Sequence, residues 1–128
     1  VFGHPAKLRR LERIIHPRVA REQIRLTKQA ARNDPKAVAI YDVPLLFEAG
    51  IDTRVDTTIV VTADRETQIA RLKKRNGLSR AEALRRIKSQ MPLTEKRRRA
   101  DYTVDGTLPL LRLKQQVRLL HQSLRTST

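Results

Sequence analysis

Hydrophobic positions along the chain alternate between helical spacing and short, nearly continuous apolar runs. The runs at residues 37–42, 55–61 and 102–105 have the length of strands, and the second is dense in β-branched side chains. Such runs are typical of a parallel sheet that is covered on both faces, and the segments between them carry apolar residues at helical spacing. The pattern therefore predicts an α/β fold in which helices and strands alternate.

Local signals predict where several helices begin and end. The dipeptide His16-Pro17 predicts a break between two N-terminal helices, because the residue before a proline is disfavoured in the α region. Gly50 ends a short helical segment over residues 44–50, and Gly77 ends the helix that follows the second strand. The sequence Ser-Arg-Ala-Glu at 79–82 is a capping box that opens the next helix. The closing helix carries one apolar stripe, made of Leu110, Leu113, Val117, Leu120 and Leu124.

Composition limits the chemistry that is available to this chain. Its 128 residues suffice for one domain of ordinary size. The absence of cysteine excludes disulfides, thiolate nucleophiles and cysteine-type zinc sites, and the three histidines are too scattered to suggest a metal cluster. No apolar run approaches the roughly 18 residues of a membrane span, so we expect a cytoplasmic protein without a membrane partner.

The charge is strongly positive and unevenly distributed. The formal net charge is +15, from 28 basic and 13 acidic side chains. Residues 69–100 alone carry 12 basic and 2 acidic side chains, whereas residues 37–68 carry 2 basic and 6 acidic ones. A partner with several negative charges is implied: nucleic acid, an anionic surface or a phosphorylated small molecule.

Five short motifs occur in a fixed order along the chain. They are Leu-Glu-Arg-Ile-Ile-His-Pro at 11–17, Asp-Val-Pro-Leu-Leu-Phe-Glu-Ala-Gly at 42–50, and segments within 68–75, 79–90 and 100–102. In this order, and at about these spacings, they resemble the dephospho-CoA kinase family across nearly the whole chain. The Pro-Leu-Leu-Phe-Glu block and the arginine-bracketed Ser-x-x-Glu helix are together quite specific, although either alone would be a weak signal.

The resemblance implies an ATP-dependent kinase that phosphorylates the ribose 3′-hydroxyl of dephospho-CoA, the final step of coenzyme A synthesis, with Mg²⁺ accompanying ATP. It implies the parallel three-layer fold of P-loop nucleoside-monophosphate kinases. By similarity, residues 1–36 are the remnant of a helical acceptor domain. Residues 37–68 and 101–128 are core by the same similarity, and residues 69–100 are the lid region.

One part of the family pattern has no counterpart here. Glycine occurs only at positions 3, 50, 77 and 106, and none of them opens a G-x-x-x-x-G-K-[ST] phosphate loop. We therefore expect an incomplete fold whose first strand, phosphate-loop lysine and catalytic aspartate are missing, and no kinase activity from these residues alone. The resemblance implies that the missing strand lies between those at 37–42 and 56–61, so unpaired edges would lower stability or pair in an oligomer.

The lid region supplies the predicted phosphate ligands. Arg71 and Arg75 lie one helical turn apart, so both guanidinium groups project from one face and can clamp a triphosphate, with Arg80 joining them when the lid closes. Spacing alone also fits exposed arginines without a specific task, and the resemblance favours the phosphate interpretation. The resemblance further implies that backbone groups hold adenine at two dipeptides, Ala100-Asp101 and Gly106-Thr107.

Three further residues are candidates for acceptor binding or for orienting Mg²⁺. Asp42 ends the first predicted strand, where open α/β sheets place ligands, although it also suits a turn. Glu48 either serves the acceptor, caps a helix or pairs with a lid arginine. His16 either contacts an acceptor phosphate or caps a helix before Pro17, and the cap is the favoured interpretation. No side chain is predicted to bind a metal directly.

A second class of function stays open at this point. The pI of about 11.4 and the basic segment 69–100 also suit a module that binds nucleic acid non-specifically through phosphate contacts. Aromatic residues make up only 3% of the chain, which leaves few platforms for base stacking, so specific recognition is not expected.

Overall fold

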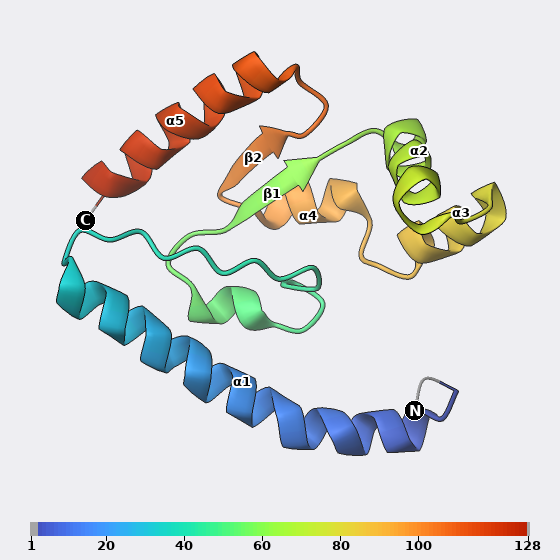
Figure 1. Cartoon of the computed structure of the whole chain (residues 1–128), viewed down its shortest axis with the longest axis horizontal. Coiled ribbons are helices and arrows are strands. Elements are labelled where there is room, and N and C mark those ends of the chain that lie inside the picture. Colours follow the sequence, from blue (N-terminus) through green and yellow to red (C-terminus); the bar gives the residue numbers. More distant parts are fainter. Residues whose placement is uncertain (1–2, 128) are drawn as a thin grey trace. The chain divides into compact units, whose positions relative to one another are not determined.

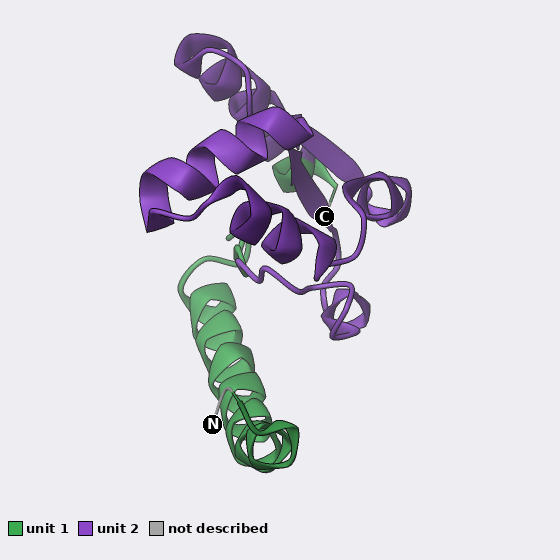
Figure 2. Cartoon of the chain, turned by 90° about the vertical axis from the view of Figure 1, so that its right-hand side faces the viewer, with its two compact units in different colours: residues 1–41, 124–128 green, residues 42–123 purple. Residues whose placement is uncertain are grey.

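The computed structural model describes residues 3–127 and divides the chain into two compact units (Figure 2). The first comprises residues 1–41 and 124–128, and the second comprises residues 42–123. The boundary near residue 41 lies a few residues beyond the predicted end of the helical segment. Residues 69–100, the predicted lid region, belong to the same unit as the sheet.

Helix α1 (Pro5–Asn33) is one continuous helix of 29 residues (Figure 1). The predicted break at His16-Pro17 is wrong, because Pro17 lies inside the helix. A proline in a helix removes one backbone hydrogen bond and crowds the preceding turn, at a cost of about 3 kcal/mol. Here several turns on each side keep their hydrogen bonds, so the helix continues, and His16 is an exposed mid-helix residue and not a cap.

The predicted strand at residues 37–42 is also wrong. This segment forms neither helix nor strand, and Asp42 therefore does not end a strand. The reason is pairing, since an apolar run becomes a strand only where a neighbouring strand takes up its backbone hydrogen bonds. In the described part of the chain, the sheet has two strands and neither pairs with this segment.

The sheet of the second unit is parallel, as predicted. Strand β1 (Ile59–Thr62) pairs with β2 (Tyr102–Asp105) in a register that places Val61 opposite Val104. Val60 and Val104 are buried, and so are Phe47, Ile69 and Ala83, which form the small core around the sheet. The second predicted strand is thus confirmed with shifted bounds, and the third is confirmed at its predicted bounds.

A polar clamp fixes the start of both strands. Thr58 is 7% exposed, and its backbone N–H and hydroxyl both donate to Asp101 Oδ2, at 2.8 and 2.9 Å. The same hydroxyl also lies 3.1 Å from the backbone N–H of Asp101, from which it accepts. Hydrogen bonds from the Thr58 backbone and side chain hold the pKa of Asp101 below its ordinary value. The clamp thereby helps to set the register of the sheet.

The helices of the second unit end largely where local signals predict. A turn over 44–50 ends at Gly50, whose φ of 68° is left-handed, and a short 3-10 helix, η1 (Ile51–Arg54), follows. Helix α2 (Arg65–Asn76) ends at Gly77 with φ 64°, and Ser79 caps α3 (Arg80–Lys88) by accepting from the N–H of Glu82. Helix α4 (Leu93–Arg99) precedes β2.

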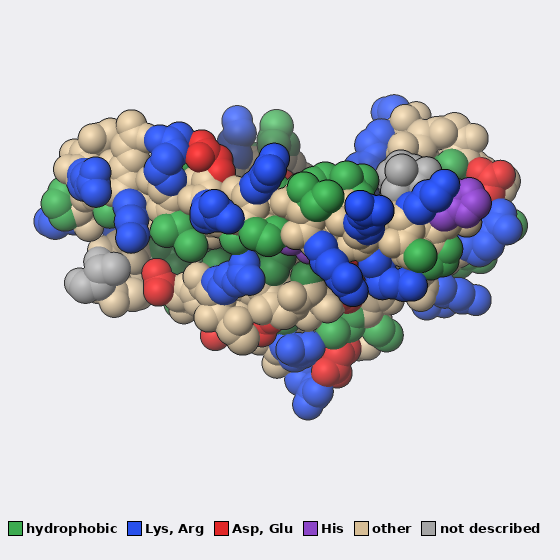
Figure 3. Space-filling model, turned by 90° about the horizontal axis from the view of Figure 1, so that it is seen from below, with side chains coloured by type: hydrophobic (Ala, Val, Ile, Leu, Met, Phe, Trp, Pro, Cys, Tyr) green, Lys and Arg blue, Asp and Glu red, His purple; other side chains and the backbone are tan. Residues whose placement is uncertain are grey.

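Helix α5 (Leu110–Thr126) closes the chain, and its residues up to Ser123 belong to the second unit. The predicted apolar stripe is only partly covered: Leu113 and Leu120 are half-buried, whereas Leu110 is 66% exposed. Among residues 3–127, no helix has both the length and the apolar character needed to cross a membrane. On the face drawn in Figure 3, lysine and arginine side chains are spread widely and acidic ones are few.

Candidate functional site

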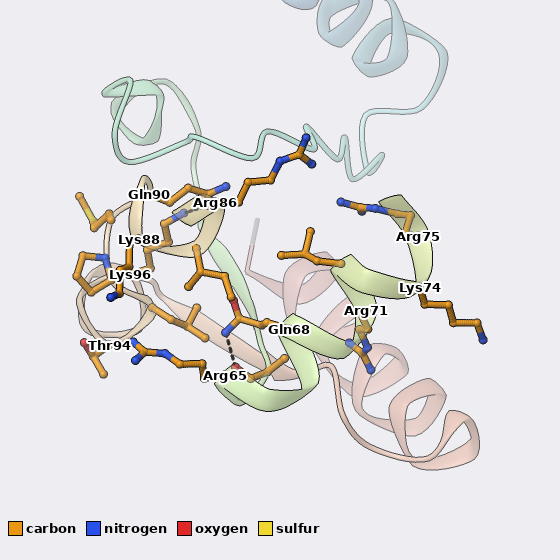
Figure 4. A pocket seen from close by; sticks show the side chains of 16 residues that line it. Arg65, Gln68, Arg71, Lys74, Arg75, Arg86, Lys88, Gln90, Thr94 and Lys96 are labelled. Carbon is orange, nitrogen blue, oxygen red and sulfur yellow. Dashed lines mark hydrogen bonds between the residues drawn. The ribbon is translucent and has the colours of Figure 1, made fainter. Parts of the chain in front are cut away.

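A cavity of about 1140 Å³ opens in the second unit beside the carboxyl end of β1. Its walls come from Ala63, from α2 and α3, and from the segment that leads into α4 (Figure 4). Open parallel sheets characteristically bind ligands outside the carboxyl ends of their strands. Ligand pockets usually measure about 300–1,000 Å³, so a nucleotide-sized molecule fits here.

Cations dominate the cavity wall. Of the 16 residues that line it, seven are basic and none is acidic: Arg65, Arg71, Lys74, Arg75, Arg86, Lys88 and Lys96. Lys96 is paired with Glu48, which lies outside the lining. The other cations repel one another, and an anion placed among them relieves that repulsion. The arrangement therefore suits a ligand with several negative charges, such as a phosphate chain.

Arg75 and Arg86 are the best-placed cations for such a ligand. Arg75 lies in the last turn of α2 and Arg86 in the last turn of α3, and these two helices contact each other. Figure 4 shows both guanidinium groups on the same side of the cavity, whereas Lys74 extends away from it. Within residues 3–127 neither arginine forms an ion pair; Arg75 donates only to the side chain of neighbouring Asn76, at 2.8 Å. Both forks are thus available for bidentate contact with phosphate.

Arg71 also lines the cavity, but its guanidinium group is already engaged. It donates to the backbone carbonyl of Gly106 at 2.7 Å and so ties α2 to the turn after β2. Gly106 is required there by space, because a Cβ would lie 2.9 Å from Val61 Cγ1 and 3.0 Å from the carbonyl oxygen of Thr62. Arg71 and Arg75 therefore line one cavity with different contacts.

Arg80, the third predicted phosphate ligand, does not line the cavity. Its guanidinium group forms a two-pronged ion pair with Glu66 in the first turn of α2, with a shortest distance of 2.7 Å. Hydrogen bonding to Arg80 holds the pKa of Glu66 below its ordinary value. Both side chains are more than half exposed, so water screens the pair, which contributes little to stability and opens easily.

Glu48 does not line the cavity, and its partner in the lid region is Lys96 and not the arginine that one interpretation predicts. Its Oε2 is 3.1 Å from Lys96 Nζ and accepts from the backbone N–H of Met91 at 3.1 Å. Burial acts to raise the pKa of Glu48, but the hydrogen bonds from backbone amides and from Lys96 outweigh it and lower the pKa. Lys96 and Met91 both line the cavity, and Glu48 itself does not.

The dipeptides predicted to hold adenine lie at opposite ends of β2. Ala100 and Asp101 precede the strand, and the Asp101 carboxylate is taken up by Thr58. Gly106 and Thr107 follow the strand, on the side of the sheet where Ala63 joins the cavity wall. The structure therefore does not bring the four residues to a single site.

The remaining candidates are not among the residues that line the cavity. Asp42 is exposed and does not line the cavity, and His16 belongs to the other compact unit. Asp64 follows β1 and Asp105 is the last residue of β2, and each accepts hydrogen bonds from a threonine two or three residues later, which lowers its pKa. Over the described residues, no group of three or more metal-ligating side chains occurs.

Arg86 and Lys96 line the cavity, and the sequence did not predict either of them as a phosphate ligand. The signal that points toward them is regional, because residues 69–100 carry an excess of ten positive charges. Which of those cations face the cavity depends on how α2 and α3 pack, and a count along the chain does not contain that information.

Comparison with known proteins identifies relatives of this chain. The family model described as dephospho-CoA kinase matches residues 1–109. A dephospho-CoA kinase from Symbiobacterium thermophilum is 49% identical over 117 residues, which cover 91% of this chain and 48% of that protein. A dephospho-CoA kinase from Geobacter metallireducens is 50% identical over 107 residues, which cover 83% of this chain and 52% of that protein. The crystal structure of TT1252 from Thermus thermophilus matches with a TM-score of 0.75 and 35% identity, over 97% of this chain and 63% of that one.

Proposed function

The chain belongs to the dephospho-CoA kinase family, and from this membership we propose that it serves the ATP-dependent phosphorylation of dephospho-CoA at the ribose 3′-hydroxyl. The chain spans about half the length of the curated relatives that it matches. Its proposed share of the work is to bind the phosphate chains of the substrates in the cavity between α2, α3 and the start of α4. The fold is that of the α/β nucleotide kinases, with a parallel sheet.

The observation that carries the proposal is the cavity wall with seven cations and no carboxylate. Phosphoryl transfer needs the charge of the moving group to be neutralised and held in line more than it needs covalent help. Arg75 and Arg86 would contact the non-bridging oxygens of the phosphate chain, each as a planar fork. Arg71 would hold the turn at Gly106 and Thr107, whose backbone is the proposed adenine contact.

Mg²⁺ is proposed to enter as a complex with ATP. Magnesium prefers carboxylate, carbonyl and water oxygens, and the residues that line the cavity supply no carboxylate. The described side chains therefore do not fit a separate magnesium site, and no step of the proposal passes through one. Asp42 and His16 remain candidates for contacts with the acceptor, and the family relationship supports a cytoplasmic location.

Two measurements test the proposed function. Titration calorimetry with ATP should show saturable binding to the 128-residue chain, and dephospho-CoA should bind as well. An assay for ADP in the presence of ATP, Mg²⁺ and dephospho-CoA should show no turnover, because the sequence contains no glycine-rich phosphate loop. A chain that binds neither substrate contradicts the proposal.

Non-specific nucleic-acid binding is the alternative outcome of a parallel titration. A random DNA duplex is titrated at two salt concentrations beside ATP. Counterion release makes binding to a duplex fall steeply with salt. If only the duplex binds, with a steep salt dependence, the basic surface serves nucleic acid and the kinase assignment of the cavity is wrong.

A further inference from the structure

Two ion pairs connect the segment 44–52 to the segment 90–99. The Glu48 carboxylate meets Lys96 at 3.1 Å, and the Asp52 carboxylate lies 3.8 Å from Arg99. The Arg99 guanidinium group also stacks 5.1 Å above the centre of the Phe47 ring, which is 6% exposed. The partners are 47 or 48 positions apart in sequence, so these contacts fix the tertiary position of the second segment.

Glu48 differs from the other paired acids because its partners form part of the cavity wall. It accepts from the N–H of Met91 and pairs with the ammonium group of Lys96, which also reaches Gln90 Oε1 at 3.2 Å. Met91, Gln90 and Lys96 all line the cavity. The two charged side chains are partly shielded, at 22% exposed for Glu48 and 13% for Lys96.

We propose that Glu48 is a positioning residue of the phosphate site: it holds the wall from Gln90 to Lys96 in place without touching the ligand. The inference rests on the proposed function for its ligand class. Its physical basis is that one carboxylate oxygen fixes two donors of that wall, a backbone amide and an ammonium group. Because this segment is already ordered before the ligand binds, binding loses less conformational entropy.

An electrostatic role and a positioning role for Glu48 predict opposite changes in ligand affinity when its side chain is removed, so the two roles can be told apart. Glu48→Ala adds one positive unit to a basic site, so a purely electrostatic role predicts equal or tighter binding of inorganic tripolyphosphate. The positioning role predicts binding weaker by about threefold to tenfold. The matched control is Glu95→Ala, which adds the same charge on α4 but breaks an exposed pair with Arg98. The control should bind as the wild type does or slightly more tightly.

Glu48→Gln protects the test against a variant that does not fold. The amide oxygen of glutamine still accepts from the Met91 N–H but lacks the charge that holds Lys96, so binding should fall by about twofold to threefold. Weaker binding in Glu48→Gln with unchanged Glu95→Ala supports positioning. Equal or tighter binding in Glu48→Gln overturns it.

Hydrogen exchange of the ligand-free chain separates this inference from the proposed function. In Glu48→Ala the amide of Met91 should exchange roughly tenfold faster or more, while the amides of β1 and β2 keep their rates. Unchanged exchange at Met91 overturns the positioning role. A wild-type chain that does not bind tripolyphosphate overturns the proposed phosphate site, and the exchange result then still decides whether Glu48 holds this wall.

Discussion

Helices α2 and α3 and helix α4 are all rich in cations, but they use them in different ways. On α4, Lys96, Arg98 and Arg99 each lie near an acidic side chain. On α2 and α3, Arg75 and Arg86 border the cavity without an acidic partner in the part of the chain that the structure describes. The comparison separates cations that ion pairs engage from cations that border the cavity without an acidic partner among the described residues, and we propose an anion as the ligand of the second group.

The largest expected effect concerns an unpaired cation. Arg86→Ala should weaken ATP binding by about tenfold to a hundredfold, because it removes a charge-assisted contact worth about 1.5–3 kcal/mol. The melting temperature should stay level or rise slightly, since the substitution relieves repulsion among the cavity cations. Calorimetric titration and a thermal melt of the same sample check both statements. Unchanged ATP affinity would remove Arg86 from the site.

Gly106→Ala tests the tight packing of the turn to which Arg71 donates its hydrogen bond. The added Cβ would lie 2.9 Å from Val61 Cγ1 and 3.0 Å from a backbone oxygen, so the turn must shift. We expect a loss of about 1–3 kcal/mol in the free energy of unfolding, as for other overpacked sites. Urea denaturation measures it. A variant as stable as the wild type would show that the turn accommodates a Cβ without strain.

Lys96→Met breaks a shielded pair while keeping the apolar stem. Glu48 then loses its cation, and we expect the unfolding free energy to fall by about 1 kcal/mol, less than for a fully buried pair because water still screens the site. The control is Arg98→Met, which breaks the exposed pair with Glu95. Its melting temperature should hardly change. An equal fall in melting temperature in both variants would show that the Glu48–Lys96 pair contributes no more stability than the exposed pair.

Lowering the pH from neutral to about 5 should change the melting temperature least of all the tests, because the paired glutamates stay ionised over that range. Hydrogen bonds and cations hold the pKa of Glu48, of Glu66 and of Glu95 below the ordinary value. A lowered pKa in the folded state contributes stability above the unfolded pKa of about 4.3, and this contribution is lost as the pH falls through the folded value. Melts at about pH 7 and pH 5 should therefore nearly coincide, with a clear drop by about pH 3. A fall in melting temperature between about pH 7 and pH 5 would show that titratable groups other than these glutamates control the stability.

Local signals in the sequence predicted the parts of the fold that depend on neighbouring residues. Gly77 ends α2 in a left-handed conformation and Ser79 caps α3, as the residue types at these positions indicated. Pro17 shows the limit of the same reasoning, because the turns on both sides of it sustain the helix. The strand expected at 37–42 failed for a non-local reason, since pairing depends on a partner strand that a local pattern does not reveal.

The sequence predicted the positive charge of the candidate site but only some of the residues that line it. The excess of basic residues over 69–100 pointed to an anion site, and Arg71 and Arg75 do line the cavity. The ion pair of Arg80 with Glu66 and the position of Arg86 depend on how α2 and α3 pack. The partnership of Glu48 with Lys96 spans 48 positions, beyond the reach of helical or strand periodicity.

The central claim is that the unpaired cations of the cavity, and not basic charge in general, bind a phosphate chain. Titration calorimetry with ATP compares the wild type with two double variants that lose equal charge, Arg75→Ala/Arg86→Ala at the cavity and Arg10→Ala/Arg13→Ala on α1. We expect the α1 variant to bind ATP nearly as the wild type does and the cavity variant to lose measurable binding. Equal weakening in the two variants would contradict the claim.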